Sequence, residues 1–239
     1  MPILGGLNRG RWWSLASAGG GYATGRRAAP QMRLLAMLIE AGDVVWDIGA
    51  HHGFMTLCAA RQVGASGEVH AFEPCARNRR MLCRHMGWNH VTNAVVHAVA
   101  LSRFDGESDF GSGTTSKMHA LGAGSERVQV RTGASLIRAG TCPAPTFAKI
   151  DVEGAEGDLV EGLIDSLPSH VRLLIAMHSA EADRACTTLL ARHGFELIPS
   201  RRLVASRHGA WLSDPDLMCI GPTYAARTEL RERLLQHRF

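Results

Sequence analysis

The fold of this chain is decided by the stretch Val44-Val45-Trp46-Asp47-Ile48-Gly49-Ala50-His51-His52-Gly53-Phe54. Its apolar residues, 44–48, predict a strand with an acid near its end, and the glycines predict a turn that leads into a helix. Gly49 and Gly53 allow backbone angles that a side chain would forbid, so the turn can approach a ligand closely. Asp47 is placed to accept hydrogen bonds from the amides of the turn or, through water, from an ammonium group.

A second acid ends the next apolar stretch, Val69-His70-Ala71-Phe72-Glu73-Pro74. In open α/β sheets, an acid about 20 residues after a glycine-rich turn binds the hydroxyl groups of a ribose, and Glu73 suits that role. A dinucleotide also needs a compact glycine triplet, which seats its pyrophosphate on a helix N-terminus. Here the turn is Gly-x-x-x-Gly, and His51 and His52 fill the space. The sequence therefore favours a phosphate-free cofactor such as S-adenosylmethionine.

Strands and helices alternate along the rest of the chain. Apolar runs predict strands at 44–48, 69–73, 94–99, 147–151, 171–177, 195–199 and 217–220. Helical spacing predicts helices at 30–40, 53–61, 76–86 (where Gly87 stops the helix), 156–166, 181–193 and 224–237. The polar stretch 102–125 is expected to carry a hairpin, followed by an added strand at 128–131. The alternation predicts a doubly wound α/β fold with a mostly parallel sheet covered on both faces.

Composition is typical of one globular domain of 239 residues. The net charge is only +4 and the basic residues are dispersed, so we expect no nucleic-acid partner. No apolar run reaches the length of a membrane span, and no membrane partner is expected. The six cysteines form no Cys-x-x-Cys pair, which argues against a zinc site and favours packing roles in a cytoplasmic protein. A homodimer stays open as the oligomeric state.

A second motif, Phe147-Ala148-Lys149-Ile150-Asp151-Val152-Glu153-Gly154-Ala155-Glu156, carries charges where a buried strand is expected. Side chains alternate along a strand, so Lys149, Asp151 and Glu153 should share one side. Buried charges need partners or a ligand. These charges also fall at the carboxyl end of a strand, where open α/β sheets bind ligands. We expect Lys149 to be buried and paired with a carboxylate.

Three blocks of the sequence resemble the FkbM-type family of S-adenosylmethionine-dependent methyltransferases. They are the turn at 47–53, Phe72-Glu73-Pro74 and, above all, the Lys-Ile-Asp-Val-Glu-Gly-Ala-Glu block at 149–156. The resemblance covers about residues 22–178. It implies a Rossmann-like class I methyltransferase fold, with a seven-stranded sheet whose last strand is antiparallel. It also implies methylation of a hydroxyl group on a small molecule such as a sugar, a polyketide or another secondary metabolite.

The resemblance and the strand ends together give a set of candidate site residues. Cofactor binding is assigned to Asp47, Gly49, Ala50, His51, Gly53, Glu73, Pro74, Ala100 and Asp151, and no metal ligands are assigned. A hydroxyl acceptor must lose its proton, so a positioned base is expected. His178 and Asp151 are the candidates for this base, Glu153 is a third catalytic candidate, and the sequence does not separate their roles.

Some positions depart from the family or have a structural interpretation instead. His51 stands where the family commonly has Asn, and His178 is all that remains of a Glu-x-His pair. Glu156 is expected to cap or charge a helix N-terminus. Residues 113–116, Gly-Thr-Thr-Ser, resemble a loop of small residues near the active site of this family.

The first 29 residues are expected to form an N-terminal arm in front of a methyltransferase domain at 30–239. The apolar run at 12–18 resembles a short signal peptide, but it soon breaks into three glycines, so an arm is preferred. Trp12, Trp13 and Tyr22 are interpreted either as a flap over the acceptor or as residues that pack on the sheet.

Two other functions stay open. A nicotinamide-dependent oxidoreductase could have a related fold, although the missing glycine triplet counts against it. A cofactor-binding or interaction protein that has lost catalysis could also have this sequence, because acids that are usual beside the acceptor pocket are replaced. Cofactor titration would exclude the first alternative, and a methyl-transfer assay would exclude the second.

Overall fold

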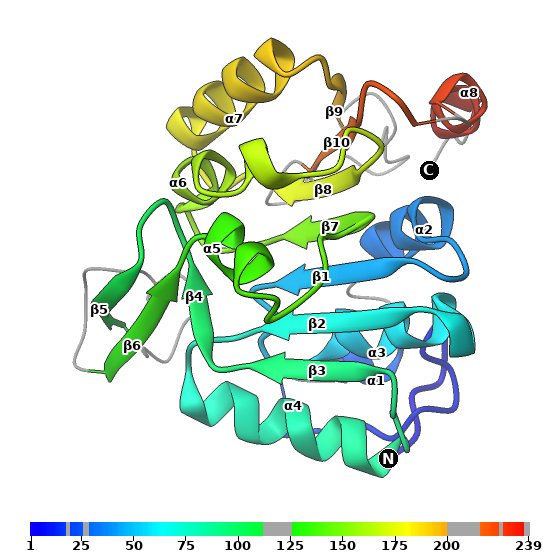
Figure 1. Ribbon diagram of the computed structural model, residues 1–239. Helices are drawn as coiled ribbons and strands as arrows, with labels where there is room; N and C mark the ends of the chain where they lie inside the picture. Colours follow the sequence, from blue (N-terminus) through cyan, green and yellow to red (C-terminus); the bar gives the residue numbers. More distant parts are fainter. Residues whose placement is uncertain (18–19, 26–28, 112–125, 200–215, 225–226, 237–239) are drawn as a thin grey trace.

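The computed structural model describes residues 1–17, 20–25, 29–111, 126–199, 216–224 and 227–236. Within these residues, seven strands form a main sheet in the order β3-β2-β1-β7-β8-β10-β9 (Figure 1). They are β1 Val44–Ile48, β2 Glu68–Phe72, β3 Ala94–His97, β7 Phe147–Ile150, β8 Arg172–Ala176, β9 Glu196–Pro199 and β10 Asp216–Ile220. β10 is antiparallel to both of its neighbours, and the other pairs are parallel. The expected α/β sheet with an antiparallel last strand is confirmed.

Helices cover both faces of the main sheet (Figure 1). One face packs against α2 Ala29–Leu38, α3 Phe54–Gln62, α4 Ala76–Trp88 and α8 Arg227–Gln236. The other face packs against α5 Gly133–Arg138, α6 Glu156–Glu161 and α7 Ala180–Arg192. The short helix α1 Gly20–Ala23 and two 3-10 helices, η1 Gly64–Ser66 and η3 Ile164–Ser166, lie in the connections. The doubly wound arrangement predicted from the sequence is therefore present.

Strand β1 lies between β2 and β7 in the main sheet, and its side chains suit that central position because they are apolar on both faces. Val45 packs into the hydrophobic cluster with α2 and α3, while Trp46 and Ile48 pack into the cluster with α5, α6 and α7. None of these three side chains is more than 1% exposed. A parallel strand with neighbours on both edges and helices on both faces requires this pattern. Its single charged residue, Asp47, is equally buried and so must find partners inside the protein.

The chain leaves the main sheet after β3, so the single strand expected at 94–99 is wrong. β4 Val99–Leu101 pairs with β6 Glu126–Arg131, and β6 pairs with β5 Gly106–Phe110, in a separate three-stranded sheet. β4 is separate from the main sheet, and its residue Ala100 packs with Val128 and Val130 in a hydrophobic cluster of the small sheet. The added strand expected at 128–131 is confirmed and begins two residues earlier. The expected loop at 113–116 lies outside the described residues.

Two expected helix boundaries are wrong for identifiable reasons. α4 continues past Gly87, because the side chain of Asn89 donates a hydrogen bond to the carbonyl of His85 and closes the last turn (2.7 Å). The helix expected after the second motif divides into α6 and η3. The break falls at Gly162, where an added Cβ would lie 2.2 Å from the carbonyl oxygen of Ser102. The chain therefore passes too close to its neighbour for any side chain at this position.

The N-terminal arm packs on α3 and α4. Trp13 is 1% exposed, stacks on the ring of His85 with 3.8 Å between ring centroids, and meets Phe54 edge-on at 5.2 Å. The amide of Ser14 donates a hydrogen bond to Nε2 of His85 (3.1 Å), and Nδ1 of the same ring lies 2.7 Å from the carbonyl oxygen of His52. Trp13 is therefore a packing residue, but it packs on helices α3 and α4 and not on the sheet.

Trp12 contacts the same C-terminal end of α4. Its backbone amide and carbonyl both bond to the side chain of Asn89, at 2.7 and 2.9 Å. Asn89 follows the C-terminal end of α4 and precedes β3, so it lies near the amino ends of the strands. The interpretation of Trp12 as part of a flap over the acceptor stays a prediction.

Two remaining expectations from composition can be compared with the structure. Five of the six cysteines are buried and all six are free, which confirms their packing role. None of the helices in the described ranges combines the length and the apolar character that crossing a membrane requires.

Candidate active site

The charged residues of both motifs lie on or just after β1 and β7, and β1, β7 and β8 are neighbours in the main sheet (Figure 1). β7 ends at Ile150, so Asp151 and Glu153 lie in the loop beyond the strand rather than on it. The backbone amide of Asp151 donates to the carbonyl of Ile48 at 3.1 Å, which joins this loop to the end of β1. His178 lies two residues beyond the end of β8. Three neighbouring strands thus deliver polar side chains to one place.

The turn after β1 touches the loop after β7. Gly49 has φ +78°, and a Cβ at this position would lie 1.9 Å from the carbonyl oxygen of Asp151. Only glycine fits, for reasons of both backbone angle and space. The amides of Gly49 and Ala50 both donate to the carbonyl of Phe72, at 3.0 and 3.1 Å, which fixes the turn against β2. His51 has φ +50°, a region in which His is enriched among side-chain-bearing residues.

Glu73 lies directly after β2, and its carboxylate is held beneath the turn. Its side chain is 4% exposed and accepts hydrogen bonds from the amides of His51 (2.7 Å) and Cys75 (2.9 Å), and from Asn78 (3.2 Å). Burial raises the pKa of Glu73, and these hydrogen bonds oppose that rise. A carboxylate offers about four acceptor positions, so three donors leave room for one more.

Lys149 is buried and paired with carboxylates, as expected, and it connects the two motifs. It is 7% exposed, and its Nζ lies 3.2 Å from Asp151 and 3.5 Å from Asp47. Burial lowers the pKa of Lys149, but the two carboxylates outweigh it and hold the pKa above its ordinary value. Asp47 is bound by this ammonium group and by the hydroxyl of Thr56 (2.6 Å), not by the amides of the turn. Thr56 was missed because the sequence gives no sign that a threonine in an apolar helix turns toward a strand.

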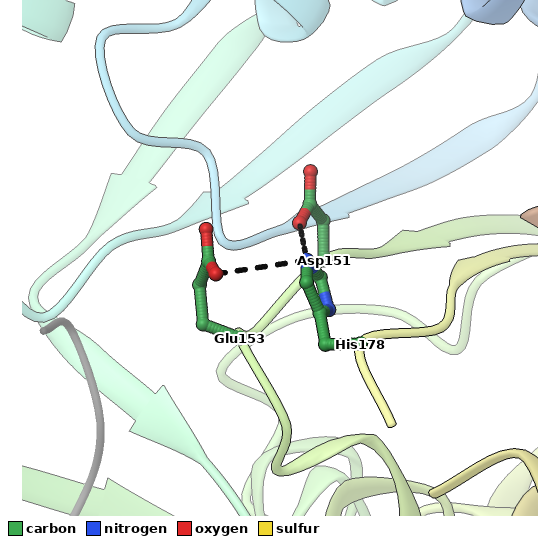
Figure 2. A group of neighbouring side chains, drawn as sticks. All are labelled: Asp151, Glu153 and His178. Atoms are coloured by element: carbon green, nitrogen blue, oxygen red, sulfur yellow. Dashed lines mark ion pairs between the residues drawn. The ribbon is translucent and has the colours of Figure 1, made fainter. Parts of the chain in front are cut away.

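His178 is surrounded by carboxylates. Its Nδ1 lies 2.7 Å from Oε1 of Glu156, and Nε2 lies 3.5 Å from Oδ1 of Asp151 and 3.7 Å from Oε2 of Glu153 (Figure 2). Burial lowers the pKa of His178, but the hydrogen bond with Glu156 and the three acidic charges outweigh it and raise the pKa to about 9. The ring therefore carries a proton at neutral pH, and a role as base requires that it first lose that proton.

Glu156 has a larger part in the site than helix capping. Its side chain is fully buried, and Oε1 also accepts from the amide of Gly154 at 2.9 Å. It therefore fixes the His178 ring and the loop that carries Glu153 at the same time. The sequence places Glu156 at the start of a helix but does not reveal that it turns inward.

Three other predicted cofactor residues have structural contacts of their own. Gly53, with φ +84°, precedes α3, and a Cβ there would lie 2.9 Å from Cγ of Leu82 in α4. The carbonyl of Pro74 accepts a hydrogen bond from Arg79. Ala100 packs in the hydrophobic cluster of the small sheet. Their part in cofactor binding stays a prediction.

Comparison with known proteins agrees with this arrangement. The family model described as the methyltransferase FkbM domain matches residues 47–197. A curated relative, the hexuronic acid methyltransferase AglP of Haloferax volcanii, is 26% identical over 165 residues, which are 67% of this chain and 66% of that protein. The chain thus matches just under two thirds of the length of that relative.

Solved structures share the fold at low sequence identity. The methyltransferase FkbM of Methylobacillus flagellatus has a TM-score of 0.51 at 20% identity, over 74% of this chain and 43% of that one. A precorrin-6y C5,15-methyltransferase of Geobacter metallireducens has a TM-score of 0.52 at 11% identity, over 82% of this chain and 88% of that one. The family match covers more than half of the chain and includes the glycine turn after β1 and the acidic loop after β7. The chain therefore belongs to the FkbM methyltransferase family.

Proposed function

We propose that this protein transfers a methyl group from S-adenosylmethionine to a hydroxyl group of a small molecule. The observation that carries the proposal is the convergence of Asp151, Glu153 and His178 beside the turn that begins at Gly49. A sugar or sugar acid is the preferred acceptor class, which the name of the curated relative, a hexuronic acid methyltransferase, supports.

The turn after β1 suits a cofactor without phosphate. The amide of His51 already donates to Glu73, and the amides of Gly49 and Ala50 donate to the chain itself, so they cannot also bind a pyrophosphate. Glu73 has one acceptor position left for a ribose hydroxyl. When bound, S-adenosylmethionine supplies a methyl group that is already activated on a sulfonium sulfur.

The residues on the acceptor side must orient a hydroxyl oxygen and receive its proton. Lys149 holds one oxygen of Asp151, which leaves Oδ1 directed toward His178. Glu156 holds the ring of His178 from behind, so that Nε2 is presented to the same space. A carboxylate or a deprotonated imidazole in this position can take the proton as the oxygen attacks in line. Asp151 and His178 both remain candidates for the base.

Cofactor calorimetry and a methyl-transfer assay test the proposal together. S-adenosylhomocysteine should bind and NAD should not, and labelled methyl should pass from S-adenosylmethionine to at least one acceptor in a panel of sugars, sugar acids and polyketide alcohols. Preferential binding of NAD would refute the proposal. Cofactor binding without transfer to any acceptor would favour a protein that has lost catalysis.

Variants at the acceptor side sharpen the test. Asp151→Asn and His178→Ala should each lower kcat about 10²–10⁴-fold if the residue is the base, the usual contribution of a positioned acid–base group. Asp158→Asn is the matched control, because Asp158 is an exposed acid paired with Arg103 on the protein surface. It should leave kcat unchanged. If neither site variant slows transfer, the acceptor needs no base and is not a hydroxyl.

A further inference from the structure

We propose that Asp151, Glu153 and His178 form a binding site for one divalent metal ion of the first transition row, such as Mn²⁺. The ion's binding is inferred from the geometry alone. Its role, which is to hold the acceptor oxygen, rests on the proposed function.

The three side chains present one ligand atom each to a common space. One ligand atom each from Asp151, Glu153 and His178 all lie within 4.8 Å of one another (Figure 2). Nε2 lies 3.5 and 3.7 Å from the two carboxylate oxygens. Ligands bound to one ion at about 2.0–2.2 Å lie roughly 3–3.5 Å apart. Small side-chain movements would therefore complete a three-ligand site.

The ligand side chains are held from outside in the way that metal ligands usually are. A metal-binding histidine commonly directs its other ring nitrogen at a carboxylate, which fixes the ring. Here Glu156 does this at 2.7 Å while fully buried. Lys149 binds the second oxygen of Asp151 at 3.2 Å and so turns Oδ1 toward the ring. The orientation of two of the three ligands is thus set before any ion arrives.

A second, independent observation points to a cation. Glu156 is 0% exposed, and its Oε2 is buried without a hydrogen-bond partner among the described residues. In the linked ion pairs of the site, four acidic side chains (Asp47, Asp151, Glu153, Glu156) face two basic ones, Lys149 and His178. Buried negative charge is costly unless positive charge offsets it. A divalent ion at the cluster would supply that charge.

The ligand types select the class of ion. Magnesium and calcium ions prefer oxygen ligands alone, whereas an imidazole beside two carboxylates suits manganese, iron, cobalt or zinc. The side chains of Asp151 and Glu153 remain 30% and 26% exposed, so a bound ion would keep positions open to water or to an acceptor oxygen. The ion would lower the pKa of an acceptor hydroxyl bound there, and the proton would then pass to solvent, because the ion would occupy the Asp151 and His178 atoms that otherwise could accept it. The sequence analysis named these three residues as catalytic candidates but not as metal ligands, because they come from two loops and form no metal-binding spacing along the chain.

Binding of Mn²⁺ alone to the full chain, after treatment with a chelator, tests the proposal. Calorimetry, with electron paramagnetic resonance of the free ion as a second measurement, should show one Mn²⁺ per chain. Glu153→Gln should weaken binding at least tenfold while the melting curve and the affinity for S-adenosylhomocysteine stay unchanged. This variant is preferred to one at His178, whose loss would leave Glu156 buried without its partner.

Asp165→Asn is the matched control. Asp165 also faces a histidine, His193 at 3.3 Å, but it is 89% exposed. Binding to this variant should equal that of the parent protein. The absence of one-to-one binding, or equal weakening by both variants, would overturn the site. Because this measurement needs neither cofactor nor acceptor, it can fail while methyl transfer succeeds, and methyl transfer that is equally fast in chelator would overturn the ion's role alone.

Discussion

Replacing Gly49 with alanine would test how closely the cofactor turn is built against the loop that carries Asp151. The new Cβ would lie 1.9 Å from the carbonyl oxygen and 2.9 Å from the carbonyl carbon of Asp151, both of them backbone atoms that cannot rotate away. That loop must retreat by about 1 Å before the contact becomes tolerable. Forced repacking of this kind costs about 1–3 kcal/mol. The left-handed backbone at φ +78° adds about 1–2 kcal/mol for any residue with a Cβ.

We therefore expect Gly49→Ala to lose about 2–5 kcal/mol of unfolding free energy in urea titrations. Turnover of the folded protein should fall by about 10²-fold, since a displacement of 1 Å in a catalytic loop has that effect. Gly64→Ala is the matched control, because Gly64 also has a left-handed backbone, φ +69°, but its added Cβ would meet nothing within 4 Å. It should lose only about 1–2 kcal/mol and keep full activity. If the two variants are equally stable and equally active, the close contact with Asp151 does not exist.

Three further outcomes follow from the contacts of buried charges. Glu73→Gln should weaken S-adenosylhomocysteine binding by about 1.5–3 kcal/mol in calorimetry, and unchanged affinity would remove Glu73 from the ribose site. Lys149→Met should lower the unfolding free energy by about 3–5 kcal/mol, because it leaves Asp47 buried without its cation; a stability equal to that of the parent would contradict the pairing. Burial and then the neighbouring His70 lower the pKa of His97 from 6.5 to about 4, so the unfolded chain takes up a proton that the folded chain refuses. The contribution of His97 to the unfolding free energy should therefore be fully present above pH 6.5 and be lost, by up to about 3 kcal/mol, as the pH falls through 4. His97→Gln should reduce this pH dependence of the unfolding free energy in urea titrations at several pH values.

The main sheet could be predicted from the sequence because its strands carry their own signal. β1 was predicted with its observed bounds, since a strand buried on both faces must be apolar throughout and the glycine turn marks its end. The small sheet could not be divided from β3 in the same way. β4 belongs to the small sheet because Ala100 packs against Val128 and Val130, which are distant in sequence. The local sequence around Ala100 does not indicate this contact.

The candidate site could be predicted where charged residues fall at the carboxyl ends of predicted strands. The pairing of Lys149 with Asp151 and the approach of His178 to Asp151 were expected from charges at neighbouring carboxyl ends, and both are present. The inward direction of Thr56 and Glu156 was not, because a polar residue on a helix is normally expected to face solvent. Burial of polar groups depends on the packing of the whole domain, and a sequence pattern does not contain it.

The ring of His85 has a consequence for how this chain can be divided. Ser14 donates to Nε2, so Nε2 is the acceptor and Nδ1 must carry the proton that it gives to the carbonyl of His52. The backbone of the cofactor turn is thus tied, through one imidazole of fixed tautomer, to the arm that the sequence sets apart at residue 29. A shortened protein that begins at residue 30 would lose both Ser14 and the Trp13 ring that covers His85. The arm is therefore part of the smallest unit in which the turn keeps its shape.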